Sequence, residues 1–292
     1  MFAPMTLALA PACRAAAREH IVDVLIAERA PRLSASRAWP VVRPALYGLL
    51  DYAKARRMAD TIAPLPGQTG LDHISDLLSL NVVARGLERV PGEGRLVVVC
   101  NHPTGIADGV AVFDALKAFR PDLCFYANAD AMRVAPRLAE VLIPVEWVEA
   151  KRTRERTRVT LTRTREALEA ERCLVIFPAG RLARRQADGR LADPPWAVSA
   201  VSIARKYAAP VLPIHVAGPW STLFHLFHRV SSELRDITLF HELLNKRGRK
   251  FALTVGQPIS PTALEGEPAE VTLRLKAHVE TALARDPDAA FA

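Results

Sequence analysis

A histidine and an aspartate lie six positions apart in residues 101–108, which read NHPTGIAD. Histidine titrates near neutral pH, so His102 can take a proton from a hydroxyl group. Asp108 can act on the other ring nitrogen, where a carboxylate fixes the tautomer and stabilises the imidazolium. On a continuous helix the two side chains would point to different faces. They meet only if the segment between them is a loop, which Pro103 and Gly105 favour. The alternative is a His102 that caps a helix or is buried in the core.

The elements around this segment are expected to present it at the edge of a sheet. Residues 96–101, LVVVCN, form an apolar and largely β-branched run that predicts a buried strand. Residues 110–119 have the pattern of a short helix. A turn directly after a buried strand is where α/β proteins place functional side chains.

Strands and helices are predicted to alternate along the rest of the chain. Further strands are expected at 81–85, 123–127, 143–148, 173–177, 211–216 and 250–256, and further helices at 129–141, 154–171, 197–207, 237–246 and 268–285. This order predicts an α/β fold in which helices cover a mainly parallel central sheet. Helices are also predicted at 14–30, 41–62 and 71–80. We therefore expect an N-terminal helical extension over residues 1–80 and an α/β domain over residues 81–292.

The helix predicted at 41–62 has an apolar side and a basic C-terminal end with Lys54, Arg56 and Arg57. It can be an ordinary packing helix or a basic amphipathic helix that rests on a membrane. We favour packing, because an apolar stripe of this kind usually faces a core.

Composition narrows the class of protein. The chain has 292 residues and a net charge of +8, with 50% hydrophobic and 6% aromatic residues, so we expect a folded core. The basic surface suits anionic lipid headgroups or phosphorylated ligands. We expect no nucleic-acid partner, because the basic residues are scattered and aromatic residues are few. No apolar run of about 18 residues occurs, so any membrane contact should be peripheral.

Several other chemistries are disfavoured. The chain has four cysteines, three of them in predicted strands, and no C-x-x-C pair, so neither a disulfide framework nor a zinc site is expected. A reducing cytoplasm is the expected compartment. A G-x-S-x-G elbow, a P-loop and a dinucleotide-binding glycine motif are also missing.

Three further blocks carry residues suited to binding. Residues 175–181, VIFPAGR, end a predicted strand in a turn where Gly180 allows close approach and Arg181 offers a planar fork for phosphate. A solvated basic loop is the alternative. Pro213 lies within a predicted strand, which places it at a strand end or a bulge. Lys151 and Arg152 follow the extended segment at 143–148, and either offers a cation for an anionic group.

Together and in this order, the blocks resemble those of the glycerolipid acyltransferases, the family that includes the 1-acylglycerol-3-phosphate acyltransferases. The resemblance covers residues 81–260. The family usually has four residues between histidine and aspartate, whereas this chain has five. The Asn-His-Pro-x-Gly form resembles hemolysin-like acyltransferases, a subgroup that includes enzymes of ornithine-lipid synthesis. Ala179 replaces the glutamate of the family's Phe-Pro-Glu-Gly block, and arginine follows the glycine directly.

The resemblance implies transfer of a fatty acyl group from acyl-CoA or acyl carrier protein to a lysolipid hydroxyl, with a lysophosphatidic acid-like acceptor, in phospholipid synthesis. His102 would be the general base and Asp108 its orienting acid. We expect the backbone amides of residues 103–105 to stabilise the oxyanion. The expected substrate contacts are Asn101, Thr104, Gly105, Gly180, Arg181, Arg152 and Pro213.

No metal and no cofactor beyond the acyl donor is expected. The expected location is cytoplasmic and peripheral, on the anionic inner face of a membrane. Two alternatives stay open: O-acylation of a lyso-ornithine lipid, and a catalytically inactive lipid-binding homologue that lost the acceptor-binding glutamate.

Overall fold

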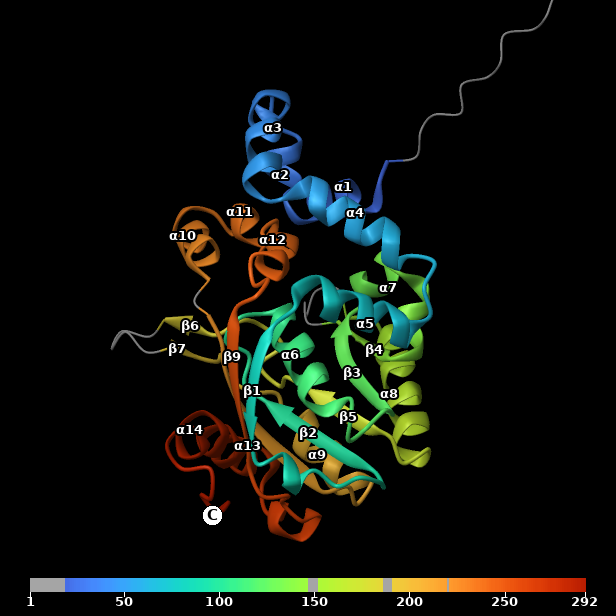
Figure 1. The fold of residues 1–292 in the computed structure, drawn as a ribbon, viewed down its shortest axis with the longest axis vertical. Helices are drawn as coiled ribbons and strands as arrows, with labels where there is room; N and C mark the ends of the chain where they lie inside the picture. Colours follow the sequence, from blue (N-terminus) through green and yellow to red (C-terminus); the bar gives the residue numbers. More distant parts are fainter. Residues whose placement is uncertain (1–18, 147–151, 186–190, 220) are drawn as a thin grey trace, which may run out of the picture.

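The computed structural model describes residues 19–146, 152–185, 191–219 and 221–292 (Figure 1). It has the predicted α/β fold, with a central seven-stranded sheet in the order β1-β9-β8-β2-β5-β3-β4. These strands are β1 (Asn81–Arg85), β2 (Leu96–Cys100), β3 (Leu123–Asn128), β4 (Leu142–Val145), β5 (Cys173–Ile176), β8 (Val211–Ala217) and β9 (Lys250–Val255). A separate antiparallel hairpin consists of β6 (Arg184–Arg185) and β7 (Leu191–Ala192).

The sheet is mainly parallel, as predicted, but two strands at one edge run the other way. Strands β8, β2, β5, β3 and β4 pair in parallel, whereas β9 is antiparallel to β8 and β1 is parallel to β9. The reversal follows from the connection between β8 and β9. It consists of α10 (Thr222–Val230), α11 (Ser232–Asp236) and α12 (Leu239–Leu244), which stay at the end of the sheet at which β8 terminates (Figure 1). The chain therefore enters β9 from the same end of the sheet and runs in the opposite direction to β8. Of these helices only α12 was predicted.

Helices cover both faces of the sheet, as the continuous apolar character of its strands requires. Alternate residues of β2 face opposite layers: Val98 packs in one core with α5 (Gly67–Leu78) and α6 (Ile106–Leu116), and Val99 packs in the other. The second core includes side chains of α8 (Arg154–Glu169), α9 (Ser199–Lys206) and α13 (Pro268–Ala277). The three described cysteines are buried in β2, β3 and β5, and burial raises the pKa of their thiols.

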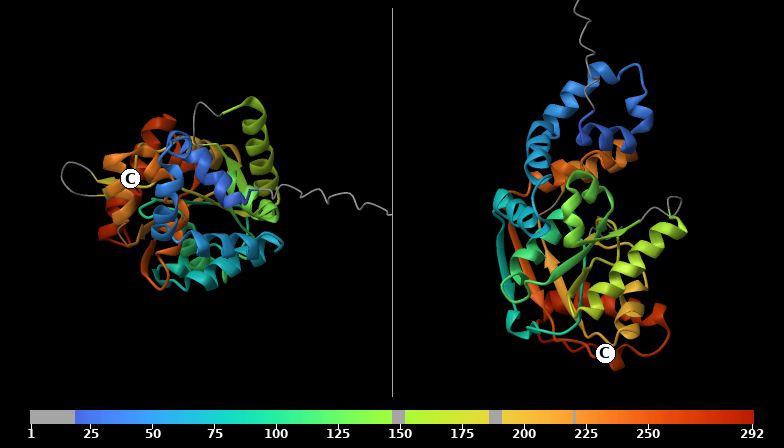
Figure 2. Two further views of the ribbon diagram at one scale, coloured as in Figure 1. Left: turned by 90° about the horizontal axis from the view of Figure 1, so that it is seen from above. Right: turned by 90° about the vertical axis from the view of Figure 1, so that its right-hand side faces the viewer.

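The N-terminal helices lie over the end of the sheet at which β2 terminates (Figures 1 and 2). They are α1 (Ile21–Arg29), α2 (Pro31–Ser34), α3 (Trp39–Leu49) and α4 (Tyr52–Ile62). The prediction of one helix over 41–62 is wrong, because Asp51 has a φ of 55° and separates α3 from α4. The turn lets α4 bury Met58 and Ile62, while part of the apolar side of α3 stays exposed.

The four N-terminal helices α1 to α4, called the cap helices below, are held in place by contacts with residues distant in sequence. The carboxylate of Glu233 on α11 accepts hydrogen bonds from the backbone amides of Arg32 and Leu33 in α2. Helix α12 packs against both α4 and α6, and α1 packs against α7 (Asp130–Val134). The helix predicted at 129–141 is interrupted at Pro136, as expected, and continues as the 3₁₀ helix η2 (Pro136–Glu140).

The remaining elements are short. The 3₁₀ helices η1 (Leu87–Arg89) and η4 (Pro261–Leu264) lie in connections, and a π-helical turn, η5 (His278–Ala282), separates α13 from α14 (Leu283–Arg285). In the described part of the chain, no helix combines the length and the apolar character needed to cross a bilayer.

Candidate active site

The structure brings His102 and Asp108 together at the end of β2. Nδ1 of His102 lies 3.0 Å from Oδ2 of Asp108, so the two side chains form a hydrogen-bonded pair across the five intervening residues. Helix α6 begins at Ile106, a turn earlier than predicted, and Asp108 belongs to its first turn. The loop that allows the contact therefore spans only the residues from His102 to Gly105.

Gly105 makes this short loop possible. Its φ of 96° and ψ of −143° belong to a region that only glycine adopts without strain. A β-carbon there would also lie 3.3 Å from the side chain of Leu182, in the turn that follows β5. The turns after β2 and β5 thus pack against each other, and the backbone at Gly105 directs the chain into α6 with Asp108 facing back toward His102.

Asp108 is fully buried and its two oxygens accept four hydrogen bonds. The donors are the His102 ring, the Thr104 amide at 2.8 Å, the Thr104 hydroxyl at 2.6 Å and the Gly105 amide at 3.0 Å. These bonds also cap the N-terminus of α6, where a negative charge is favourable. The carboxylate is therefore fixed in one orientation before any substrate binds.

The prediction that the backbone amides of residues 103–105 stabilise the oxyanion is wrong. Pro103 has no amide hydrogen, and the amides of Thr104 and Gly105 both donate to Asp108. The sequence could not reveal this, because it depends on the direction in which the turn folds. Thr104 is only 1% exposed and its hydroxyl is bonded to Asp108, so its side chain orients the carboxylate and is not placed to touch a substrate.

His102 keeps one ring nitrogen available. Its Nδ1 bonds to Asp108, its ring packs 4.6 Å from the ring of Phe177, and 16% of its side chain is exposed. Within the described residues Nε2 has no hydrogen-bond partner. A proton held on Nδ1 by the carboxylate leaves the lone pair of Nε2 ready to accept a proton. This arrangement is suited to general-base chemistry.

Asn101 and Pro213 have structural positions next to this pair. The Asn101 amide is buried and exchanges two hydrogen bonds with the peptide groups of Val216, at 2.9 and 2.7 Å, which ties the ends of β2 and β8 together. Pro213 is buried in β8. It lies opposite the irregular segment that follows β9, where the amide of Gly256 donates to the Pro213 carbonyl. A proline at such an irregularity is expected.

Gly180 and Arg181 lie in the turn after β5, which packs against the histidine turn through Leu182. Gly180 has a φ of 60° and its amide donates to the Phe177 carbonyl. Arg181 is exposed and has no hydrogen bond or ion pair with the described residues. The structure therefore brings this turn to the His–Asp pair with a guanidinium that is available for an anionic group.

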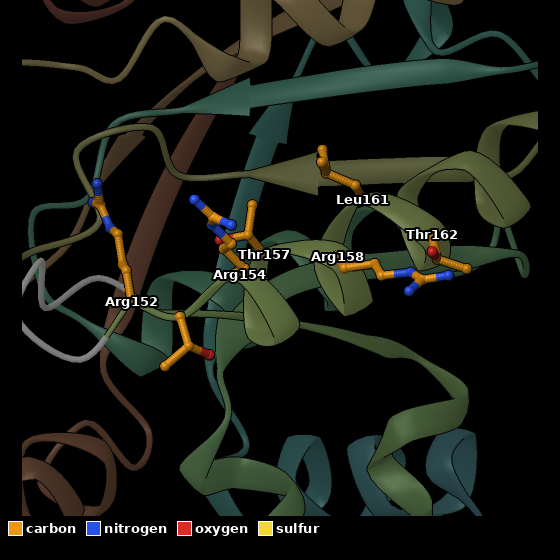
Figure 3. Close-up of a pocket in the computed structure, with 7 residues that line it drawn as sticks. Arg152, Arg154, Thr157, Arg158, Leu161 and Thr162 are labelled. Atoms are coloured by element: carbon orange, nitrogen blue, oxygen red, sulfur yellow. The ribbon is translucent and has the colours of Figure 1, made fainter.

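Arg152 is placed elsewhere. It lies before α8 and lines a hollow of about 480 Å³ together with Arg154, Arg158, Leu161 and Thr162 (Figure 3). The residues lining this hollow include none of the turns that hold His102, Asp108 or Arg181. The neighbouring candidate Lys151 lies outside the described residues.

Asp193 is a functional candidate that the sequence reasoning missed. Both of its carboxylate oxygens lie 3.1 Å from the backbone nitrogen of His102, which donates to them. Oδ2 also accepts a hydrogen bond from the indole of Trp196 at 2.9 Å. Burial raises the pKa of the Asp193 carboxyl to about 6. It stands far from the His–Asp block in a loop without a spacing motif, so no sequence feature marked it.

Comparison with known proteins gives consistent findings. The model of a family described as acyltransferase matches residues 26–280. A lyso-glycine lipid O-acyltransferase from Phocaeicola vulgatus is 28% identical over 196 residues, which cover 65% of this chain and 68% of the relative. A protein of the same name from Bacteroides thetaiotaomicron is 26% identical over 195 residues, covering 65% of this chain and 70% of the relative.

Among solved structures, the chain is similar to the 1-acyl-sn-glycerophosphate acyltransferase PlsC from Thermotoga maritima. The identity is 17% and the TM-score is 0.47, over 89% of this chain and 97% of the other. The family match begins within α1, so it includes the cap helices as well as the sheet.

Proposed function

This chain belongs to the acyltransferase family, and we propose that it transfers a fatty acyl group from a thioester donor to the hydroxyl of a lysolipid. The observation that carries the proposal is the hydrogen bond between His102 and Asp108 at the end of β2, which leaves Nε2 available as a base. The buried, four-fold bonded carboxylate fixes that arrangement in advance.

The proposed reaction needs no covalent enzyme intermediate. Nε2 of His102 takes the proton of the acceptor hydroxyl as its oxygen attacks the thioester carbonyl. Asp108 stabilises the imidazolium that forms. When the tetrahedral intermediate collapses, the carbon–sulfur bond breaks, the ester remains, and the imidazolium returns the proton to the departing thiolate.

For the acceptor, we propose a lysolipid with an amino-acid headgroup. Two relatives are named lyso-glycine lipid O-acyltransferases, and Ala179 stands where the block that this segment resembles in the glycerolipid acyltransferases has an acceptor-binding glutamate. Arg181, exposed in the turn that packs against the loop of the His–Asp pair, would bind the anionic headgroup through a charge-assisted hydrogen bond. A lysophosphatidic acid acceptor would engage the same guanidinium, so the choice between them requires a direct comparison.

The test is acyl transfer from labelled acyl-CoA and from acyl carrier protein to lyso-glycine lipid, lyso-ornithine lipid and lysophosphatidic acid. We expect transfer to an amino-acid lysolipid, with His102→Ala as the blank. Preference for lysophosphatidic acid would overturn the headgroup assignment but keep the reaction. If no acceptor is acylated from either donor while folded protein binds the lysolipids, the chain is the inactive lipid-binding homologue.

We propose that the hollow on α8 binds the anionic part of the acyl donor. Arg152, Arg154 and Arg158 line it, and none of the described residues that line it is acidic (Figure 3). Helix α8 starts at the sheet edge where β4 ends, three strands from β2, which corresponds to roughly 14 Å across the sheet. The flexible pantetheine arm common to CoA and acyl carrier protein is suited to such a separation.

Replacing Arg154 and Arg158 together by alanine is expected to raise the KM for the donor about tenfold, because two charge-assisted contacts are lost. The KM for the acceptor should stay within about twofold. Arg165→Ala is the matched control, since Arg165 is an exposed arginine on the same helix paired with Glu169. Steady-state kinetics with each substrate varied in turn would check this, and an unchanged donor KM would contradict it.

We propose that the molecule meets an anionic membrane through α3 and α10. Val41 is 80% exposed, Leu49 50% and Val230 71%, and both helices lie at the end of the molecule opposite to the C-terminus (Figure 1). Residues 30–50 include three arginines and no acidic residue, and α10 also has none. Apolar side chains beside cations are the combination that binds an anionic interface.

Val41→Gln combined with Leu49→Gln is expected to weaken vesicle binding about tenfold to a hundredfold, because each inserted side chain contributes on the order of 1 kcal/mol. The control is Leu273→Gln, since Leu273 on α13 is 64% exposed but lies far from this surface (Figure 1). Cosedimentation with vesicles with and without phosphatidylglycerol measures the effect. Equal binding by all three proteins would contradict the assignment of the surface.

A further inference from the structure

The main chain of His102 is held on both sides by the base of the β6–β7 hairpin. The His102 carbonyl accepts a hydrogen bond from the Ala183 amide at 2.9 Å, and the His102 amide donates to both oxygens of Asp193. Arg184 pairs with Ala192 in the hairpin, so Ala183 and Asp193 flank its open end. The position of the candidate base thus depends on a segment outside its own turn.

Asp193 is an unusual group to bury. The residue is 5% exposed, and its hydrogen bonds come from the His102 amide and the Trp196 indole. No lysine or arginine pairs with it in the part of the chain that the structure describes. An ionised carboxylate without a cation destabilises a folded protein, and its burial raises its pKa to about 6. Buried carboxyl groups that lack a cationic partner and have a raised pKa are typical of functional sites.

A second layer fixes Asp193 in turn. Its backbone amide donates to Oε1 of Glu280 at 2.7 Å, and Glu280 also pairs with Lys276. Glu280 belongs to the π-helical turn η5, an irregularity that is frequent at functional sites. This turn is attached to the sheet, since the His215 ring hydrogen-bonds to the Val279 carbonyl.

We propose that Asp193 is a positioning residue for acyl transfer, which holds the His102 main chain and places a second negative charge beside the imidazolium formed during proton transfer. Glu280 secures this arrangement by fixing the Asp193 backbone. The inference rests on the proposed function, because it assigns His102 as the base. Asp108 acts on the ring of His102, whereas Asp193 acts on its peptide group, so the two carboxylates are not redundant.

The decisive variant is Asp193→Asn, which keeps the size of the side chain and removes its charge. We expect kcat to fall about 10- to 100-fold, with the KM of donor and acceptor within about twofold of wild type. The acid limb of the kcat/KM profile should move to lower pH, because the imidazolium loses a neighbouring negative charge. The titratable groups facing Asp193 are His102, Cys100 on β2 and Glu280 on η5. The pH profile of Glu280→Gln shows how much of the shift comes from Glu280.

Asp122→Asn is the matched control. Asp122 accepts a hydrogen bond from the Cys173 amide at the opposite end of the sheet, so it makes the same kind of backbone contact away from the site. Unlike Asp193, it also pairs with an arginine, Arg120. Thermal unfolding measures the stability that this variant loses, and its kcat per folded molecule should equal that of wild type. If Asp193→Asn unfolds, Glu280→Ala against Glu280→Gln replaces it, since only glutamine retains an oxygen acceptor for the Asp193 amide. A kcat within twofold of wild type in folded Asp193→Asn would overturn the proposal.

A second readout separates this inference from the proposed function. The imidazole resonances of His102, assigned with His102→Ala, can be titrated by NMR in wild type and in Asp193→Asn. We expect the midpoint in the variant about half a pH unit lower or more. If wild type transfers no acyl group, the proposed function fails, and this titration still decides whether the Asp193 charge acts on the His102 ring. Identical midpoints would overturn the role of the charge.

Discussion

His102→Ala is expected to lower the rate of acyl transfer about 10³-fold, which is within the range that a positioned general base contributes. The variant removes the only nitrogen placed to accept the hydroxyl proton in the site formed by the turns after β2 and β5, within the described residues. The 16% exposed ring packs on Phe177 and is not part of the deep core, so the fold should survive. Initial rates at saturating donor and acceptor give the comparison.

The control for this variant is His73→Ala, a histidine on α5 outside the site. It should keep wild-type kcat and KM. Circular dichroism of both variants shows whether each is folded. A rate of transfer by folded His102→Ala within tenfold of wild type would rule out His102 as the base. If wild type itself transfers no acyl group, the chain is the catalytically inactive homologue.

Asp108→Asn is expected to reduce kcat by about 10³- to 10⁴-fold, similar to the loss when the orienting aspartate of a catalytic triad becomes asparagine. The amide of asparagine can donate to Nδ1 and thereby hold the proton on Nε2, the wrong nitrogen for a base. It also lacks the charge that stabilises the imidazolium. Steady-state kinetics over a range of pH would measure both effects.

The same variant should lose stability, because the carboxylate accepts four hydrogen bonds and caps α6. We expect a cost of roughly 1.5–3 kcal/mol for hydrogen bonds to a charged group, measured by chemical denaturation. Thr104→Val is the graded control, since it removes the hydroxyl donor and keeps the charge. An Asp108→Asn enzyme with kcat within tenfold of wild type, corrected for folded protein, would show that Asp108 serves only the helix.

The sequence was sufficient to locate the strands of the sheet and the His–Asp block. Buried strands such as β2 and β5 are continuous apolar runs bounded by turn residues, and this pattern is local. Proline and glycine in the block likewise predicted the loop between His102 and Asp108. Helix α6 starts earlier than predicted because a buried aspartate caps it, and the pattern of apolar residues alone does not register a cap of this kind.

Only the tertiary structure decided the contacts between segments that are distant in the chain. The sequence alone determined an α/β fold, a histidine and an aspartate able to act as base and orienting acid, and the absence of an apolar run of about 18 residues. The fold decided that the amides of Thr104 and Gly105 donate to Asp108 and that Asp193 holds the His102 peptide. It also decided that Arg152 lies before α8, in a hollow whose lining does not include His102. The physical reason is that local patterns record which face of an element is buried, whereas hydrogen bonds across loops depend on how the elements pack.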